Sequence, residues 1–589
     1  MKERTPAPGG AAPGGPRRPG PPVDRRQRVL RRALPAGLLA LAALVAGIVV
    51  GAGGSDAGRA AVDAYAKAWS AGDWATMHAQ LTAAAQKRIG LIPFADANRA
   101  ALATATALET AVRTGTPRRA GDHLWRVPVT VPTRVFGTIR GDVLVPVKDD
   151  GGDVKVDWVP RLLFPGLRDG QRLTRDTVMP ARGAILARDG TVLAQGPGRT
   201  SSIPDVASQV VGQLGAIPAA RVQELSALGV PPDGRVGVTG LERVFDAQLA
   251  GAPSGVLKAG PTVLARSAGH PGADVRTTID PVIERAATAA LGGRYGGAVA
   301  LNPRTGELYA FAGVPFSILQ PPGSTFKMIT AAAALDAGIA APSSTFPYAS
   351  QALLSGVPLA NAGGEVCGGS LAQAFAVSCN SVFAPLGAKL GAARLVQAAE
   401  RFGFNQPSPI AGVAESTIPA ADQIGDDLAV GSSAIGQGRV QATTLEMAQV
   451  AATIADGGRL PRLTLSLADA RRVDARGARL GARAIKARTA AQMRDLMLGV
   501  VRYGTGTAAQ ITGVPVAGKT GTAELKSSQP GEISSNPQDT DAWFAAFAPA
   551  GRGRRPKVTV GVMLVSAGAG GDTAAPVARE ILATALQRH

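Results

Sequence analysis

The sequence has few aromatic residues (4%), only two cysteines and no internal repeat, and its 46% hydrophobic content indicates a globular protein rich in Ala, Val and Leu. Basic residues outnumber acidic ones by 62 to 43, a formal charge of +19 that would suggest nucleic-acid binding. Beyond the first 32 residues, however, they are scattered, and no basic stripe is interleaved with aromatic side chains. We therefore expect no nucleic-acid partner, and an anionic membrane or wall polymer as the counter-charge.

Residues 33–53 form a charge-free apolar run that is long enough to span a bilayer. The run follows a Pro/Gly/Arg-rich stretch, residues 1–32, that is predicted to be a disordered cytoplasmic tail and ends in Arg25, Arg26, Arg28, Arg31 and Arg32. The positive-inside rule then predicts a cytoplasmic N-terminus and an exported body. A cleaved signal peptide is the alternative, although its apolar region is normally shorter.

A chain of 589 residues requires several folded units. Val62, Tyr65, Ala66 and Trp69 have the spacing of an amphipathic helix, and alternation in residues 124–135, 141–150 and 153–164 predicts strands. Residues 55–165 are therefore expected to form a small α+β domain without convergent catalytic groups. Residues 166–275 are rich in Gly and Pro, with a probable hairpin over Arg188-Asp189-Gly190, and are expected to be an irregular connector.

Residues 276–589 are expected to form one larger domain. The sequence predicts a helix (281–291), two strands (296–302 and 307–313) and an Ala-rich helix from Ser324. A strand ending at Lys519, two more strands (542–548 and 557–565) and a closing helix (about 574–587) follow. Strands at both ends with helices between them imply an antiparallel sheet closed by distant segments. The fold class is thus multidomain α+β.

Ser324 and Lys327 are the first candidate catalytic pair, in PPGSTFKMIT. If a helix begins near Ser324, both side chains lie on one face, a turn apart. The serine hydroxyl is a poor nucleophile until a base removes its proton, and lysine is a base only when burial or a neighbouring cation depresses its pKa. On its own, Ser-x-x-Lys is a weak signal, usually a solvated helix pair.

Two further elements accompany this pair. Ser378-Cys379-Asn380 offers a hydroxyl for proton relay and an amide for substrate, and Lys519-Thr520-Gly521-Thr522 offers a cation and a glycine that permits close backbone approach. Ser534-Ser535-Asn536 and Arg113-Thr114-Gly115-Thr116 are decoys, because the first follows Lys519 and the second lies in the small N-terminal domain. Only the set 324/327, 378/380 and 519/521 occurs in one order within one domain.

The ordered set is typical of penicillin-binding proteins and class A β-lactamases. The chain resembles a class B penicillin-binding protein over most of its length, through ARGAILARDGTVLA (181–194), TGLERVFDAQLAG (239–251), TIDPVIERAA (278–287) and IGQGRVQATTLEMA (435–448). Residues 55–165 are similar to the nuclear-transport-factor-like N-terminal domain of methicillin-resistance-type members. The resemblance makes residues 166–275 a pedestal domain and 276–589 the transpeptidase domain, with the serine β-lactamase-like fold.

The resemblance implies a D,D-transpeptidase that needs no metal or cofactor. Ser324 would attack the penultimate D-Ala of a stem peptide, with Lys327 as base, Ser378 and Lys519 passing the proton to the leaving amine, and Asn380 holding the acyl side chain. Lys519, Thr520 and Thr522 would hold the carboxylate, next to Gly521. The implied partners are peptidoglycan stem peptides and lipid-linked precursor strands, β-lactams, the cytoplasmic membrane and, since no glycosyltransferase domain precedes the pedestal, a membrane glycosyltransferase.

Two positions stand out against the family pattern. Ala187 occupies a place where the pedestal signature usually has aspartate. Cys379 is the middle residue of the second motif, which favours a disulfide with Cys367 over two buried thiols. A D,D-carboxypeptidase uses the same groups with water as acceptor and stays open as an alternative, as do a non-enzymatic β-lactam sensor and a wall-assembly scaffold.

Overall fold

The computed structural model describes residues 54–108, 112–475, 481–524 and 540–589. The predicted tail and span, residues 1–53, lie outside these ranges, as do the decoy Ser534-Ser535-Asn536 and most of the polar loop before residue 541. Among the described residues, no helix has both the length and the apolar character needed to cross a membrane. The chain divides into two compact units, Met1–Thr174 with Leu257–Ala265, and Arg175–Val256 with Arg266–His589.

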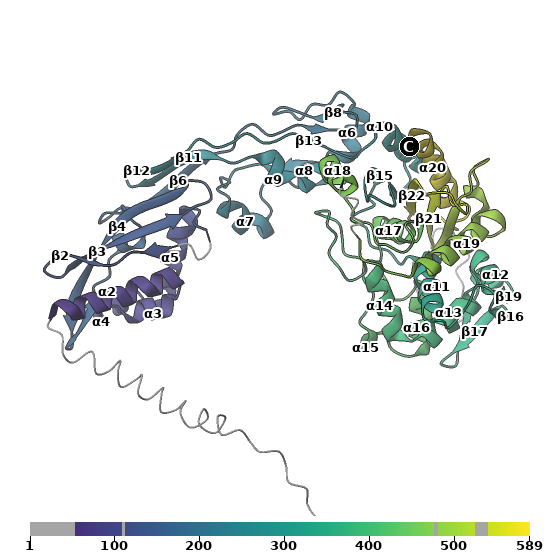
Figure 1. Cartoon of the computed structure of the whole chain (residues 1–589), viewed down its shortest axis with the longest axis horizontal. Helices are drawn as coiled ribbons and strands as arrows, with labels where there is room; N and C mark the ends of the chain where they lie inside the picture. Colours follow the sequence, from purple (N-terminus) through teal and green to yellow (C-terminus); the bar gives the residue numbers. More distant parts are fainter. Residues whose placement is uncertain (1–53, 109–111, 476–480, 525–539) are drawn as a thin grey trace, which may run out of the picture. The chain divides into compact units, whose positions relative to one another are not determined.

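The first unit packs helices against one face of an antiparallel sheet (Figure 1). Its helices are α2 (Gly54–Ala71), α3 (Trp74–Ala79), α4 (Ala83–Arg88) and α5 (Leu91–Thr104). The strands, ordered β1-β3-β4-β5 with β2 beside β3, are β1 (Arg113–Thr114), β2 (Arg118–Gly121), β3 (Leu124–Pro132), β4 (Thr138–Asp150) and β5 (Asp153–Val156). The predicted stripe of α2 is buried, from Val62 at 0% exposure to Ala66 at 3%. The predicted strand 153–164 was too long, because Pro160 begins a 3-10 turn (Pro160–Leu163).

The predicted connector, residues 166–275, is divided between the two units. It contains β6 (Leu173–Val178), β11 (Ser254–Ala259) and β12 (Thr262–Ser267) in one sheet, the predicted hairpin β7 (Ile185–Leu186) and β8 (Val192–Ala194), the pair β9 (Leu214–Gly215) and β10 (Val236–Gly237), and the helices α6 (Pro204–Val210), α7 (Val222–Ala227), α8 (Gly240–Val244) and α9 (Asp246–Ala250).

An ion-pair network joins the two family-like segments of the connector. Arg182 Nε lies 2.7 Å from Glu242 Oε2 and its Nη2 lies 2.8 Å from Asp246 Oδ1, while Arg199 and Arg221 pair with the same two carboxylates. Both carboxylate side chains are nearly inaccessible, at 1% and 4%. Removing one partner from such a network would leave a buried charge uncompensated.

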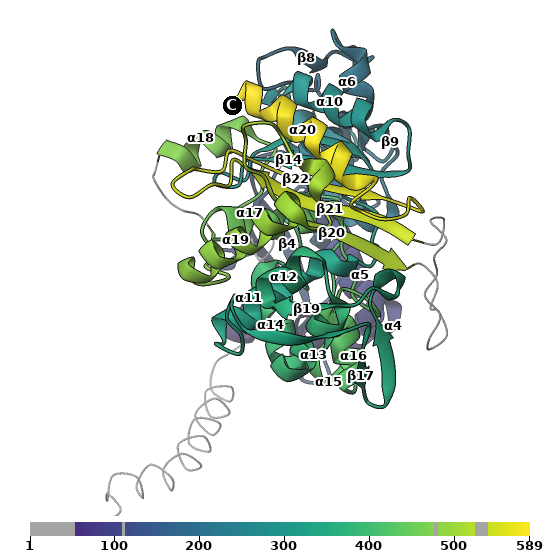
Figure 2. The same ribbon diagram turned by 90° about the vertical axis from the view of Figure 1, so that its right-hand side faces the viewer.

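The part of the second unit within residues 276–589 is built on a five-stranded antiparallel sheet, ordered β15-β14-β22-β21-β20. Strands from both ends of this region meet in one antiparallel sheet, as predicted. Its strands are β14 (Gly296–Leu301), β15 (Leu308–Gly313), β20 (Ala517–Glu524), β21 (Thr540–Ala548) and β22 (Val558–Leu564). Figure 2 shows helix α20 (Ala574–Arg588) crossing one face of this sheet, where α10 (Pro281–Leu291) also packs.

Alternation along β21 assigns the two faces of the sheet to two cores. Phe544 belongs to the cluster that includes α10 and α20, whereas Trp543 and Phe547 belong to the larger cluster with the helices of the other face. Those helices are α11 (Lys327–Asp336), α12 (Leu371–Ala376), α13 (Asn380–Leu390), α14 (Ala392–Phe402), α15 (Ala421–Ile424), α16 (Asp427–Ala434), α17 (Thr444–Ala455) and α19 (Ala487–Tyr503). Helix α18 (Leu467–Ala475) lies between α17 and α19 in the chain. Four short strands, β16 (Thr345–Ala349), β17 (Gln351–Leu354), β18 (Val357–Ala360) and β19 (Cys367–Ser370), lie between α11 and α12 in the chain.

Candidate active site

Ser324 lies in a 3-10 turn, Gly323–Phe326, that leads into helix α11 at Lys327. Gly323 has a φ of +51°, and a Cβ on it would lie 2.5 Å from the carbonyl oxygen of Thr522 in β20. Glycine is therefore required for the turn to pack against the strand. The prediction of an α-helix starting at Ser324 was wrong by one turn, because α11 begins at Lys327.

Ser378 and Asn380 come from the break between two helices, α12 and α13. Ser378 has a φ of +62°, which is unusual for a residue with a Cβ and is found where the surrounding structure fixes the backbone. Cys379 is the N-cap residue of α13 and Asn380 is its first residue. The break turns the side chain of Ser378 and the amide of Asn380 toward Lys327.

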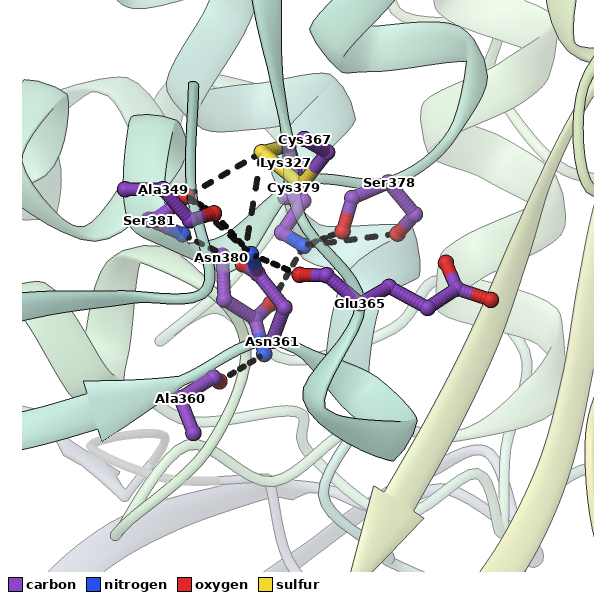
Figure 3. Close-up of a disulfide and its surroundings, with 10 residues drawn as sticks. All are labelled: Lys327, Ala349, Ala360, Asn361, Glu365, Cys367, Ser378, Cys379, Asn380 and Ser381. Atoms are coloured by element: carbon purple, nitrogen blue, oxygen red, sulfur yellow. Dashed lines mark hydrogen bonds between the residues drawn. A yellow bond between two sulfur atoms is a disulfide. The ribbon is translucent and has the colours of Figure 1, made fainter. Parts of the chain in front are cut away.

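Figure 3 shows the hydrogen bonds that the amine of Lys327 makes with Ser378 and Asn380. Lys327 Nζ lies 2.6 Å from the carbonyl oxygen of Ser378, 2.6 Å from Asn380 Oδ1 and 3.3 Å from Ser378 Oγ. The side chain has an exposed fraction of 0%. Lys327 therefore ties the first motif to the second.

Lys519 approaches the same hydroxyl from the sheet. Its Nζ lies 2.8 Å from Ser378 Oγ and 3.0 Å from the carbonyl oxygen of Thr520. The predicted strand was too short at this point, because β20 continues past Lys519 to Glu524. The Ser378 hydroxyl thus lies between two buried amines and connects all three motifs.

Burial disfavours the charge on both amines. It lowers the pKa of Lys327 well below the usual lysine value, and the positive charge of Lys519 lowers it further. Burial also lowers the pKa of Lys519 to about 7. A lysine with a depressed pKa is available as a neutral base near neutral pH, which is what activation of a serine hydroxyl needs.

A cavity of about 590 Å³ opens beside these groups. Ser324, Ser378, Asn380, Thr520 and Thr522 all contribute to its lining. Gly521 lies between the two threonines, and a Cβ on it would be 2.8 Å from the carbonyl oxygen of Pro322, so the glycine permits the close backbone approach that the sequence predicted. Residues of all three motifs therefore line one cavity.

Cys367 and Cys379 are joined in a disulfide with a Cα–Cα distance of 5.8 Å (Figure 3). The bond ties β19 to the residue between Ser378 and Asn380. Asn361, which also lines the cavity, supports the same segment by accepting from the backbone N–H of Ser381 at 2.7 Å and donating to the carbonyl oxygen of Glu365 at 2.8 Å. The second motif is therefore held by a covalent bond and by a buried amide.

Replacing both cysteines with alanine is expected to lower the free energy of unfolding by about 3 kcal/mol, because the disulfide restrains a loop in the unfolded chain. Urea denaturation of the wild-type and variant proteins measures this. Reductant should destabilise the wild type and leave the variant unchanged. An unchanged midpoint, together with equal thiol alkylation before and after reduction, would mean that the bond is absent.

Sequence reasoning missed several cavity residues, among them Asn361 and Thr505. Asn361 carries no local signal, since it follows a short hairpin without a motif. Thr505 has one that was overlooked, because the two glycines that flank it interrupt the end of a helix just before the third motif. The decoy Arg113-Thr114-Gly115-Thr116 begins with strand β1 in the first unit and takes no part in the site.

Two protein families match the chain. The family described as penicillin binding protein transpeptidase domain matches residues 296–583, and the family described as NTF2-like N-terminal transpeptidase domain matches residues 57–171. The first match contains every residue of the three motifs. The second covers the helices and sheet of the first unit.

Individual relatives give the same assignment. Peptidoglycan D,D-transpeptidase PbpA of Mycolicibacterium smegmatis is 36% identical over 407 residues, which cover 59% of this chain and 80% of that protein. The crystal structure of PBPA from Mycobacterium tuberculosis is similar at 28% identity with a TM-score of 0.52, covering 69% of this chain and 100% of that one. A ceftriaxone acyl-enzyme complex of the M. tuberculosis protein is similar at 29% identity with a TM-score of 0.52, covering 69% and 99%.

Proposed function

The chain belongs to the class B penicillin-binding proteins, the serine D-Ala-D-Ala transpeptidases of cell-wall synthesis, and from this premise we propose how its own residues carry out the reaction. The observation that supports the proposal most directly is the meeting of Lys327 and Lys519 at the hydroxyl of Ser378, beside the cavity that Ser324 lines. A nucleophile, a base with a depressed pKa and a relay hydroxyl are the minimum that acyl transfer requires.

Acylation begins when Lys327, in its neutral form, accepts the proton of the Ser324 hydroxyl. The serine oxygen attacks the penultimate D-Ala carbonyl of a stem peptide, and the peptide bond to the terminal D-Ala breaks. The leaving nitrogen takes a proton from the Ser378 hydroxyl, which recovers one from the adjacent lysines. Asn380 holds the acyl side chain, and Lys519, Thr520 and Thr522 hold the terminal carboxylate.

Deacylation transfers the peptide to the amine of a neighbouring strand. The amine attacks the ester carbonyl, its proton passes to the Ser378–Lys327 pair, and the Ser324 oxygen leaves with a proton. A β-lactam carries a carboxylate next to a reactive carbonyl and acylates the same serine, which stays blocked when no acceptor amine can attack. Whether an acceptor amine can reach the ester of Ser324 therefore decides whether the enzyme completes the cross-link or stays acylated.

We also propose, from the sequence, how the protein is anchored, how its domains are divided and which partners it has. Residues 33–53 anchor the chain once in the bacterial cell membrane, with the N-terminus in the cytoplasm and the catalytic domain outside. Residues 55–165, 166–275 and 276–589 are the N-terminal, pedestal and transpeptidase domains. Lipid-linked precursor strands supply the substrate, and a separate membrane glycosyltransferase polymerises the glycan.

The test uses purified full-length protein in detergent, given a donor stem pentapeptide and an amine acceptor. We expect mass spectrometry to show a product in which acceptor has replaced the terminal D-Ala, increasing with acceptor concentration. Ser324→Ala serves as the control and should form none. If only the shortened tetrapeptide appears at every acceptor concentration, the protein is a D,D-carboxypeptidase; if neither product appears, the sensor or scaffold alternative is favoured.

A further inference from the structure

A three-residue turn, Gly504-Thr505-Gly506, follows helix α19 and lies against the end of helix α12. A Cβ on residue 504 would lie 2.1 Å from the carbonyl oxygen of Ala376, so glycine is needed for this approach. The backbone N–H groups of the turn all donate, Gly504 to Gly499 at 3.2 Å, Thr505 to Ala376 at 3.1 Å and Gly506 to Val500 at 2.9 Å. The turn therefore holds Thr505 in one position against Ala376, which lies two residues before Ser378 in the chain.

The hydroxyl of Thr505 lies against the third motif. Thr505 Oγ1 is 2.5 Å from Thr520 Oγ1, and both residues line the catalytic cavity. The other acceptor of the Thr505 hydroxyl, the carbonyl oxygen of Ala376, is 3.5 Å away, which is at the limit of a hydrogen bond. The short contact between the two threonines is thus the stronger one, and either hydroxyl can be its donor.

The direction of this bond decides what Thr520 can offer a ligand. A carboxylate only accepts hydrogen bonds, so each hydroxyl that holds it must direct its own proton toward it. If Thr505 donates to Thr520, the Thr520 proton is left for the cavity, and the two bonds strengthen each other. The hydroxyl oxygen of Thr522 also accepts a hydrogen bond, from the backbone N–H of Gly570 at 3.4 Å, and its own proton is likewise left for the cavity.

We propose that Thr505 is a positioning residue for carboxylate recognition: it donates to Thr520 and thereby aims the Thr520 proton at the carboxylate of the donor peptide or β-lactam. The inference rests on the proposed function, in which Thr520 and Thr522 hold that carboxylate. Thr505, which lies outside the three motifs, would then contribute to the selection of ligands that carry a carboxylate. Carboxylate recognition then depends on a turn that also contacts the helix before Ser378.

The experiment measures acylation of the full-length protein by a penicillin and by its methyl ester, which lacks the charge. Thr505→Val, which removes only the hydroxyl, should slow acylation by the penicillin about tenfold, as expected for a hydrogen bond to a charged group. Thr505→Ser should stay within about twofold, and the ester should react at similar rates with all three proteins. The penicillin-to-ester ratio does not depend on the active fraction of a preparation, and Thr505→Ala provides a second hydroxyl deletion.

Thr507→Val is the matched control, because it removes a hydroxyl from the same segment and should leave the ratio unchanged. In a Thr520→Val background, Thr505→Val should cause no further loss, since its effect passes through Thr520. A further tenfold loss there, or an equal loss with penicillin and ester, would overturn the inference, as would a wild-type ratio in Thr505→Val. Wild-type protein that no penicillin acylates would instead overturn the proposed function.

Discussion

Ser324→Ala is expected to reduce covalent labelling by a fluorescent penicillin by about 10⁴-fold or more, because it removes the proposed nucleophile of the acyl-enzyme. Ser324 lines the cavity at the start of α11, and the turn that holds it packs on β20 through Gly323. Removing one oxygen from a half-exposed side chain leaves that packing intact. Labelling on denaturing gels over a time course, with protein melting measured in parallel, gives the rate.

The matched control is Ser378→Ala, which removes a hydroxyl from the same cavity but leaves the nucleophile. We expect it to slow labelling by about 10²–10³-fold, as for loss of a proton relay, while the final extent of labelling stays close to that of the wild type. The two variants therefore differ in end point as well as in rate. Equal labelling of Ser324→Ala and wild type would remove Ser324 as nucleophile.

The first helix and several strands of the transpeptidase domain were predictable from the sequence, because neighbouring residues determine where they begin and end. Helix α10 begins and ends where expected, since Asp280 caps it, Pro281 occupies its first turn and Gly292 ends it in the left-handed region. Strands β14 and β22 are continuous apolar runs, as expected for strands covered on both faces. The sequence predicted a sheet closed by distant segments, and the structure closes it by pairing β14 with β22.

The predicted ends of helices and strands were wrong where tertiary contacts determine them. The first turn of the nucleophile helix is a 3-10 turn because Gly323 is held against the carbonyl oxygen of Thr522, a contact that is absent from local periodicity. Strand β20 runs through Lys519 because β21 pairs with it over its whole length. The sequence predicted that this strand ends at Lys519, but the polar residues Thr520 and Thr522 continue it, because they line a cavity and pair with the neighbouring strand.

The order of the three motifs predicted which side chains meet, but not what supports them. Asn361 and Thr505 belong to no motif, and each acts by bonding to a segment distant in sequence. The buried network of Arg182, Glu242 and Asp246 has the same character, since each of its charges alone would resemble an exposed surface residue. Supporting residues of this kind require the fold before they can be recognised.

Lys327→Met is the second large expected effect. Methionine fills a similar volume but cannot accept a proton, so we expect the acylation rate to fall by about 10³-fold, the usual contribution of a general base. Lys389→Met, at an exposed position near the end of α13, is the control and should react like the wild type. A Lys327→Met variant that is acylated at the wild-type rate would exclude this lysine as the base.

The pH dependence of acylation identifies the cause of the depressed pKa. Lys327 acts only when unprotonated, so the rate should increase as pH rises through its pKa and then level off. Burial lowers that pKa first and the charge of Lys519 lowers it further, so Lys519→Met should raise it and move the increase to higher pH, whereas Lys519→Arg, which keeps the charge, should not. Because burial lowers the pKa of Lys519 itself to about 7, the difference should be largest below pH 7, where Lys519 is charged. A shift of the Lys519→Met profile to lower pH would show that the two amines do not repel each other in the resting site.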